Sequence, residues 1–460
     1  MALIMENILK SVTERSIRYF GRLQEDNVIP SSAAIESLSK LDESLPEGPT
    51  DIESVIHLLD EIGSPATVLT TGGRYFGFVT GGSLPVALAA NWLAGAWDQN
   101  AGLRVMSPIA SVLEQIALGW LCDVLCLPAE AGGGFVSGAT MANFTALAAA
   151  RHALMQKQGW DVEAKGLFGA PPVSVVVGDE VHVSVLKALS LLGFGRERVI
   201  RVPVDEQGRL RADALSELTE TTIVCIQAGN VNTGAFDPAV EICAAARNAG
   251  AWVHVDGAFG LWAAASPKHA HITSGFEAAD SWAIDAHKWL NVPYDSGIAF
   301  CRDPAHLRGA MSASAAYLQV GEQREPYHYV PEMSRRARGI EIWAALRSLG
   351  RSGLSDLIER TCRYARRFAK GLTQAGYPVL NDVVLNQVLV AFGDAETTRR
   401  VIEKVQTDGT CWCGSTEWQG HTAMRISVSS WATTESDVER SLEAILRIAK
   451  NENILPAHNC

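Results

Sequence analysis

The sequence predicts an α/β protein whose large domain is built on a mostly parallel sheet. Two observations carry this prediction. Between about residues 170 and 301, short runs of β-branched and apolar residues alternate with helical patterns long enough to cross over a sheet. These runs are almost continuously apolar, as expected for strands that are buried on both faces. The pattern changes near residue 350, where we expect a smaller α+β domain to begin.

The expected elements divide the chain into three parts. Residues 1–75 should form an N-terminal helical segment that starts with an amphipathic helix over Met1–Phe20, and a loop rich in glycine and aromatic residues follows at Arg74–Pro85. Residues 76–350 should form the large domain and residues 351–460 the small one. Strands are expected at Val173–Val177, Arg198–Val204, Thr222–Gln227, Trp252–Val255, Ser281–Ile284 and Gly297–Cys301, and in the small domain near Val383–Phe392 and Arg425–Val428. Helices are expected at Leu84–Trp97, Pro108–Leu125, Thr140–Gln158, Val183–Leu192, Ala212–Leu218, Pro238–Ala249, Ser352–Ala375, Glu396–Thr407 and Glu435–Lys450.

Composition excludes several classes of protein. With 47% hydrophobic and 20% charged residues, the chain of 460 residues can bury a large core. A formal net charge of −12 argues against nucleic-acid binding, which needs a basic face. No apolar run reaches the length of a membrane span, and the N-terminus lacks a signal-peptide pattern, so we expect a cytoplasmic protein without a membrane partner. The cysteines are scattered, and the CxC pair of Cys411 and Cys413 has no second pair, so no metal site is expected.

Candidate functional residues follow the predicted strands. In sheets of this class, ligands bind at the carboxyl ends of the strands. Asp256 follows one apolar strand, and the segment DAHKW, which contains Lys288, follows another. A glycine-rich segment, GGGFVSGATMAN, leads directly into the helix that begins at Thr140.

Each of these features has a functional and a purely structural interpretation. The run Gly132–Gly134 with Gly138 could present bare amides to a phosphate at a helix N-terminus, or could form a tight turn capped by Thr140. Lys288 could be a buried amine nucleophile with a lowered pKa, or a surface lysine that extends its stem over apolar neighbours. Asp256 could pair with a protonated ring nitrogen, or could cap a loop. Together the three supply what a pyridoxal phosphate (PLP) site needs.

Two sequence motifs resemble those of a known enzyme family. SWAIDAHKWLNVPYDSG resembles the lysine motif, and HVDGAFG the aspartate motif, of the PLP-dependent group II amino-acid decarboxylases, which include the aromatic-L-amino-acid, tyrosine and glutamate decarboxylases. The resemblance runs from about Arg74 to Arg338 and continues less sharply to the C-terminus. Ser296 departs from the motif, which usually has Cys or Ala there. The resemblance implies the fold type I of aspartate aminotransferase.

The resemblance also implies roles for individual residues. Lys288 corresponds to the Schiff-base lysine, Asp256 to the partner of the pyridine nitrogen, Ala258 to the residue under the ring, and His182 to the histidine stacked on its other face. The remaining cofactor contacts it implies are Ala139, Thr140 and His287 near the phosphate, Asp285 where aromatic decarboxylases have Asn, and Asn230 near the phenolic oxygen. A carboxylate at Asp285 needs His287 or another donor beside it to offset its charge.

Tyr317 lies 29 residues after Lys288 in a segment of small residues. It resembles the loop tyrosine that returns a proton after CO2 departs, whereas aldehyde-forming relatives have Phe there. The structural alternative is an ordinary exposed tyrosine. Arg335 and Arg338 match a basic pair that could contact phosphate or carboxylate, or merely cover a helix.

The substrate pocket implied by the resemblance comes from two subunits of a homodimer with shared active sites. One segment is Phe78–Gly81, with Phe78, Thr80 and Gly81, and the other is the partner's Trp97–Gly102, with Trp97 and Asn100. The sequence WDQNAG favours a substrate with polar or cationic side-chain groups, because an unsatisfied buried polar group costs roughly 1–3 kcal/mol. Trp97 and Phe78 still allow an aromatic one.

The expected activity is decarboxylation of an L-amino acid to an amine and CO2, through a quinonoid intermediate on a Lys288 Schiff base. Two alternatives remain open. One is another PLP reaction on the same scaffold, by an aldehyde synthase, an aminotransferase or an aldolase-type lyase, since fold does not decide reaction. The other is a catalytically silent homologue that serves as a binding or scaffold subunit.

Overall fold

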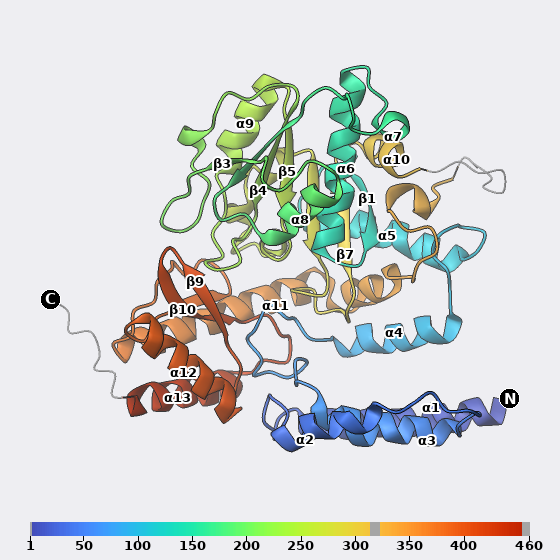
Figure 1. The fold of residues 1–460 in the computed structure, drawn as a ribbon, viewed down its shortest axis with the longest axis vertical. Helices are drawn as coiled ribbons and strands as arrows, with labels where there is room; N and C mark the ends of the chain where they lie inside the picture. The colour runs from blue at the N-terminus through green and yellow to red at the C-terminus, as the bar shows by residue number, and fades with distance from the viewer. Residues whose placement is uncertain (1, 313–322, 453–460) are drawn as a thin grey trace.

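A computed structural model describes residues 2–312 and 323–452 and confirms the predicted α/β class (Figure 1). The large domain contains a seven-stranded sheet in the order β1-β7-β6-β5-β4-β2-β3. Its strands are β1 (Gly132–Val136), β2 (Ser174–Gly178), β3 (Ile200–Val202), β4 (Thr222–Gln227), β5 (Trp252–Asp256), β6 (Ser281–Asp285) and β7 (Gly297–Cys301). Strands β3, β2, β4, β5 and β6 are parallel, whereas β7 runs antiparallel to both β6 and β1.

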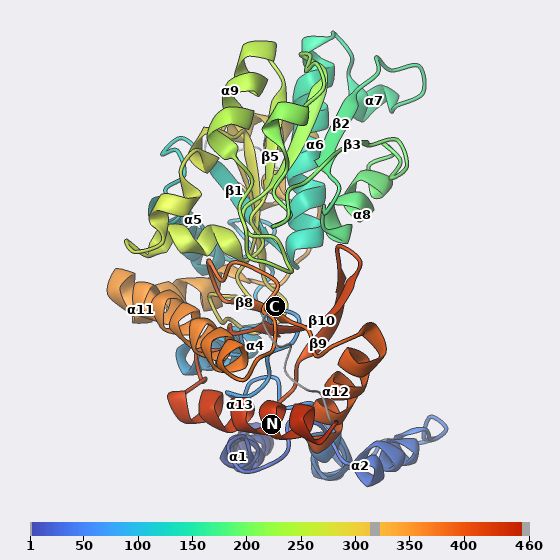
Figure 2. The same cartoon turned by 90° about the vertical axis from the view of Figure 1, so that its left-hand side faces the viewer.

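Helices cover both faces of this sheet, as the apolar strands predict. In β2, Val175 and Val177 pack with α6 (Ala139–Lys157), α8 (Val183–Leu191) and α10 (Pro304–Met311), while Val176 faces the other side. That side is covered by α5 (Pro108–Val124) and α9 (Ala239–Ala249). Figure 2 shows β5 between α9 and α6. Alternate side chains along each strand thus pack in two separate cores, one on each face of the sheet.

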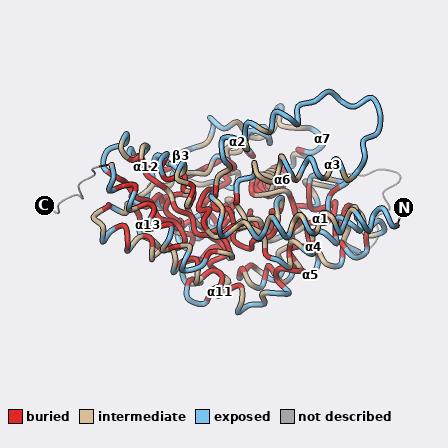
Figure 3. The backbone as a smooth tube through the Cα atoms, turned by 90° about the horizontal axis from the view of Figure 1, so that it is seen from below, coloured by how far each residue is buried: buried red, intermediate tan, exposed pale blue. Residues whose placement is uncertain are grey.

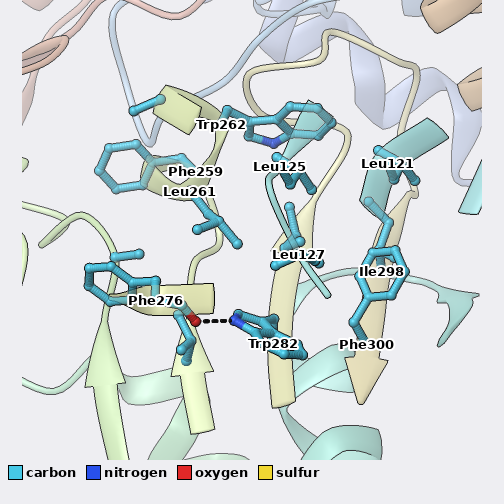
Figure 4. Packing of buried hydrophobic residues seen from close by; sticks show 14 of the residues in the cluster. Leu121, Leu125, Leu127, Phe259, Leu261, Trp262, Phe276, Trp282, Ile298 and Phe300 are labelled. Atoms are coloured by element: carbon cyan, nitrogen blue, oxygen red, sulfur yellow. Dashed lines mark hydrogen bonds between the residues drawn. The ribbon is translucent and has the colours of Figure 1, made fainter. Parts of the chain in front are cut away.

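Buried tryptophans anchor the core beside the candidate site (Figure 4). Trp282 is fully buried, and its indole N–H donates to the carbonyl of Phe276 at 2.9 Å. Trp262 is also fully buried and donates to the carbonyl of Asp285 at 2.9 Å. Each ring therefore buries a large apolar area without leaving its polar atom unsatisfied.

The small domain packs helices against a three-stranded antiparallel sheet. The strands are β8 (Gln387–Val390), β10 (His421–Ser427) and β9 (Gly414–Trp418), in that order across the sheet, and the helices are α12 (Ala395–Asp408) and α13 (Glu435–Asn451). The long helix α11 (Gly339–Gln374) connects the two domains and has a non-helical residue at Gly350. Its residues up to Cys362 pack in the large core, and those from Ala365 onward pack in the small one.

The N-terminal helices lie along the outside of the molecule (Figures 1 and 3). They are α1 (Ala2–Arg22), α2 (Ser32–Ser37) and α3 (Ile52–Leu58). Helix α4 (Pro85–Trp97) follows them in the chain, and the short α7 (Val162–Lys165) follows α6. Large apolar side chains on α1 are exposed, among them Leu3, Ile4, Met5, Leu9 and Ile17. No helix in the described part of the chain is long and apolar enough to cross a membrane.

The structure differs from the sequence analysis in two predictions and one omission. The expected helix at Ala212–Leu218 shrinks to a single turn of 3-10 helix, Ala212–Ala214. The glycine run Gly132–Gly134 belongs to strand β1 rather than to a turn, because β7 supplies antiparallel partners for its backbone. Strand β9 was not expected, since Ser415 and Glu417 interrupt its apolar pattern and its pairing with β10 decides its conformation.

We predict that Gly297→Ala destabilises the fold. A Cβ at Gly297 would lie 2.5 Å from the Cα of Gly138, where the chain leads into α6. Overpacking of this kind costs about 1–3 kcal/mol, so urea denaturation should show a loss of that size in the free energy of unfolding. Gly119→Ala is the control, because a Cβ there meets nothing within 4 Å and alanine favours the helix. Equal stability of the two variants would contradict the prediction.

Candidate active site

The predicted site residues converge at one edge of the sheet. Since β1, β2, β4, β5 and β6 run in the same direction, their carboxyl ends meet there. Asp256 is the last residue of β5 and Asp285 the last of β6. His182 follows β2, and Gly138 follows β1 and precedes α6. The opposing strand β7 begins at the same edge with Gly297.

Lys288 is held by the carboxylate of Asp285. The Lys288 Nζ lies 2.9 Å from the Asp285 Oδ2. Burial disfavours the ammonium form, but the charges of Asp285 and Asp256 outweigh burial and raise the pKa of Lys288 above its ordinary value. The expectation of a lowered pKa is therefore wrong for the protein without cofactor, because a paired buried lysine stays charged.

The glycine-rich segment before α6 is shorter than predicted, because Gly132–Gly134 belong to β1 and only Gly138 remains at the helix N-terminus. Gly138 approaches His287 so closely that a Cβ there would lie 3.0 Å from the imidazole Cε1. The Ala139 N–H donates to the Asp285 Oδ1 at 2.6 Å, and Thr140 is the next helical residue. A phosphate fits such a glycine-led helix N-terminus.

His287 lies beside Asp285, where the sequence analysis expected a donor. Its Nδ1 accepts a hydrogen bond from the Ser296 N–H at 3.1 Å, so the neutral ring carries its proton on Nε2. That Nε2 lies 3.5 Å from the Asp285 Oδ1. Burial lowers the pKa of His287, although Asp285 opposes this shift. Asp285 thus faces the donors of His287, Ala139 and Lys288.

Asp256 is buried without a cationic partner. Its Oδ1 accepts from the Ala258 N–H at 3.2 Å, and its Oδ2 lies 3.4 Å from the Asn143 Nδ2 and 3.5 Å from the Ser184 Oγ. No ion pair joins it to a lysine, arginine or histidine within residues 2–312 and 323–452. A buried carboxylate with only neutral donors fits a partner that brings its own positive charge, as a protonated pyridine nitrogen does.

His182 completes the group as the N-cap of α8. Its Nδ1 lies 2.8 Å from the Ser184 Oγ and accepts from the Ser184 N–H at 3.2 Å. Burial lowers the pKa of His182; Asp256 raises it, and Lys288 and Arg425 lower it further. The imidazole is therefore neutral near pH 7, which suits contact with a flat ring.

One of the two predicted substrate segments lies against Lys288. Gly81 packs on the Lys288 carbonyl so tightly that a Cβ would clash, and Thr80 is buried. Phe78 is 64% exposed and stacks on Trp412 with ring centroids 5.3 Å apart, and Trp412 in turn stacks on Tyr75 at 5.1 Å. We call Phe78, Trp412 and Tyr75 the aromatic platform.

The second predicted segment lies elsewhere in the same chain. Trp97 is 43% exposed at the end of α4, and the Asn100 Oδ1 accepts from the backbone N–H groups of Gly102 and Arg335. Asn100, Arg335 and Arg336 line a cavity of about 650 Å³ that includes none of the cofactor residues. One subunit alone therefore does not bring Trp97 and Asn100 to Lys288.

The structure places the other candidates as follows. Tyr317 lies outside the described residues. Asn230 closes its own turn, with its Oδ1 accepting from the N–H groups of Asn232 and Thr233, and its role beside the cofactor stays a prediction.

Arg335 pairs with the buried Glu114 at 2.6 Å, and Arg338 with Asp295 at 2.9 Å. Cys411 and Cys413 are buried in the small core, and no cluster of metal-ligating residues occurs in the described ranges.

Sequence reasoning missed four residues of the site. Asn143 is one helical turn after Ala139, a spacing that could have revealed it. Ser184 is two residues after His182. Arg425 is a partly buried arginine in strand β10, and desolvation lowers its pKa. Trp412, between two cysteines, gave no signal of its own.

Comparison with known proteins agrees with this geometry. Residues 35–392 match the model of the pyridoxal-dependent decarboxylase conserved domain. The chain belongs to this family. It is 26% identical to an aromatic-L-amino-acid decarboxylase of Bacillus atrophaeus, with 92% of each chain covered, and 30% identical to an L-2,4-diaminobutyrate decarboxylase of Rhizobium meliloti, with 79% of this chain and 75% of the relative covered. A crystal structure of Oryza sativa TDC with PLP and tryptamine shares the fold, with a TM-score of 0.91, 23% identity and 98% of each chain covered.

Family membership confirms the resemblance that the two motifs indicated. The chain is a PLP-dependent carboxy-lyase of fold type I, and pyridoxal phosphate is its cofactor. The residues at the sheet edge could hold this cofactor: Lys288 would meet its aldehyde, Asp256 its ring nitrogen, and the start of α6 with His287 its phosphate.

We predict that cofactor capture accelerates with rising pH, because Lys288 must lose its proton before it can attack an aldehyde. Its raised pKa should extend this rise above the ordinary lysine range. Asp285→Asn removes the strongest raising contact, so the profile should shift to lower pH and capture at pH 8 should be faster. Stopped-flow growth of the cofactor's visible band measures the rate. Asp295→Asn is the control, since Asp295 pairs with Arg338. Overlapping profiles for Asp285→Asn and the wild type would contradict the prediction.

Proposed function

We propose that this protein decarboxylates an L-amino acid to the corresponding amine and CO2, with Lys288 as the residue that carries the cofactor. The observation that supports this most is the buried Asp256, which has only neutral donors and sits at the same sheet edge as Lys288 and His182. When bound, PLP supplies an electron sink for the pair left by the departing CO2.

Four residues of the chain would contact the cofactor ring or the substrate. Asp256 would hold a proton at the ring nitrogen of the cofactor. Ala258 is small enough to leave room beneath the ring, and the neutral His182 would face the ring from the other side. Arg425 has a partly buried guanidinium that bonds to the Asn232 Oδ1 at 3.2 Å and lies near enough to His182 to lower its pKa. It is therefore our candidate for the substrate carboxylate.

Tyr317 is our candidate for the acid that returns a proton to Cα. Its support is its position 29 residues after Lys288, the spacing of the loop tyrosine in the decarboxylases that the sequence resembles. A phenol retains its proton near pH 7, so it can donate when a carbanion is left at Cα.

The aromatic platform supports a specific substrate class. Phe78 is exposed on it, three residues before Gly81, which packs on the Lys288 carbonyl. Aromatic faces bind other rings by stacking, worth about 0.5–1.5 kcal/mol. The polar Asp98, Gln99 and Asn100, if they come from a partner subunit, offer partners to a polar ring atom. We therefore propose a substrate with an indole, phenol or imidazole side chain.

A homodimer with shared active sites accounts for two observations. Trp97 and Asn100 do not reach Lys288 within one chain. Large apolar side chains are also exposed over neighbouring parts of the surface, which is expensive unless another surface covers them. They include Leu3, Ile4, Met5 and Leu9 on α1, Trp92, Leu93 and Trp97 on α4, Val105 and Met106, and Ile109, Val112 and Ile116 on α5. We infer that a second copy covers them.

Amino-acid profiling tests the proposed reaction. We expect equal amounts of amine and CO2 from tryptophan, tyrosine or histidine, and little from leucine, glutamate or 2,4-diaminobutyrate. Tyr317→Phe should reduce amine formation by about 10²- to 10⁴-fold, the usual contribution of a general acid, while CO2 release persists and aldehyde appears as oxygen is consumed. If the wild type yields aldehyde and CO2 in place of amine, or keto acid without CO2, another PLP reaction replaces this one. A best rate with 2,4-diaminobutyrate would overturn the substrate class.

Subunit mixing tests the shared site. Lys288→Ala and Trp97→Ala homodimers should each be weakly active or inactive. In a mixed dimer, one site combines Lys288 from one chain with Trp97 from the other, so random mixing should restore about a quarter of wild-type activity. Each variant mixed with itself is the control. If the mixture stays as inactive as its parents, both residues act within a single chain.

A further inference from the structure

A line of buried polar side chains runs from Asp256 into the interior of the large domain. Asn143 on α6 lies between Asp256 and His254, with its Nδ2 3.4 Å from the Asp256 Oδ2 and its Oδ1 2.8 Å from the His254 Nε2. The His254 Nδ1 lies 2.9 Å from the Ser281 Oγ, and the Trp252 indole N–H donates to the same oxygen at 2.9 Å. The side chains of Asn143, His254 and Ser281 have no solvent exposure.

The hydrogen bonds of this line have one consistent direction. An indole N–H can only donate, so the Ser281 oxygen accepts from Trp252 and its own hydrogen is free to donate to the His254 Nδ1. His254 then carries its proton on Nε2 and donates to the Asn143 Oδ1. Burial lowers the pKa of His254 to about 3, which keeps the ring neutral.

The opposite amide orientation is unfavourable. It would turn the Asn143 carbonyl oxygen toward the Asp256 carboxylate, two acceptors of which one is charged. In the observed orientation the amide group donates toward Asp256 and also to the Ser184 Oγ at 3.2 Å. Ser184 in turn contacts the His182 Nδ1 at 2.8 Å. One amide therefore connects the aspartate for the ring nitrogen with the histidine for the ring face.

We propose that Asn143, oriented by His254, is a positioning residue that fixes the Asp256 carboxylate and the Ser184–His182 pair toward the cofactor ring. The line contains only neutral groups, so it orients Asp256 without neutralising it. A lysine or arginine in its place would compete with the ring nitrogen for the same carboxylate. This inference rests on the proposed role of Asp256, and it does not depend on which amino acid is the substrate.

Cofactor affinity of the emptied protein tests the proposal without any turnover. PLP is removed, and its dissociation constant is measured by quenching of tryptophan fluorescence during titration. Asn143→Leu removes the amide at similar size, and we expect PLP to bind about ten- to a hundred-fold more weakly, the usual effect of losing a hydrogen bond to a charged group. Thermal unfolding without cofactor shows whether the variant still folds.

Two variants of His254 separate orientation from packing. His254→Phe keeps the ring and removes the donor, so affinity should fall by about three- to ten-fold, a smaller loss because Asn143 remains. His254→Gln places an amide N–H near the position of the imidazole Nε2 and should recover affinity to within about two-fold of the wild type. His269→Phe is the matched control, since His269 is also buried and bonded to a serine, Ser266, away from the site. Equal losses for the Phe and Gln variants of His254 would overturn the role of the donor.

A double-mutant cycle with Asp256→Asn completes the test. If Asn143 acts through the carboxylate, Asn143→Leu should weaken PLP binding much less in the Asp256→Asn background than in the wild type. Equal losses in the two backgrounds would overturn the proposal and leave the role of Asp256 intact. If Asp256→Asn alone leaves PLP affinity unchanged, both the ring-nitrogen role and this inference fail.

Discussion

The carboxylate of Asp285 is the contact on which the arrangement of the active site depends. It ends strand β6 and joins three groups from different parts of the chain: the Ala139 N–H at the start of α6, the His287 imidazole and the Lys288 ammonium. Because the carboxylate is almost fully buried, it requires these donors, and each donor is thereby held at the sheet edge. The Trp262 indole holds the backbone carbonyl of the same residue. Sheet, helix and lysine segment are thus aligned around one negative charge.

The two strand-end carboxylates of the site differ in what surrounds them, and this difference separates their roles. Asp285 pairs with a cation of the chain itself, so its charge is already compensated in the protein without cofactor. Asp256 receives only neutral hydrogen bonds, from Ala258, Asn143 and Ser184, so a further positive partner is still favourable there. Neighbouring strands β5 and β6 thus end in two aspartates, of which only Asp285 is already paired with a cation of the chain. Asp256 is therefore the one whose carboxylate could pair with a protonated pyridine nitrogen.

Local signals explain which parts of this arrangement the sequence could predict. The apolar strands and the residues that follow them depend on local pattern, so Asp256, Asp285 and Lys288 could be placed at one edge before the structure was known. The strand conformation of Gly132–Gly134 depends on pairing with β7, a segment more than 160 residues further along the chain, which no local pattern reports. The raised pKa of Lys288 and the part played by Asn143 depend on which side chains meet, since burial alone predicts the opposite shift for the lysine.

Helix α6 links the two ends of the cofactor site. Its N-terminus at Ala139 and Thr140 would face the phosphate, and Asn143, about one turn later, reaches Asp256, the proposed partner of the ring nitrogen. The spacing between these two functions is therefore built into the helix. Its position is set in turn by the contact of Gly138 with Gly297, where only glycine allows the two backbones to meet. On the proposed roles of these residues, a displacement of α6 would disturb both ends of the cofactor at once.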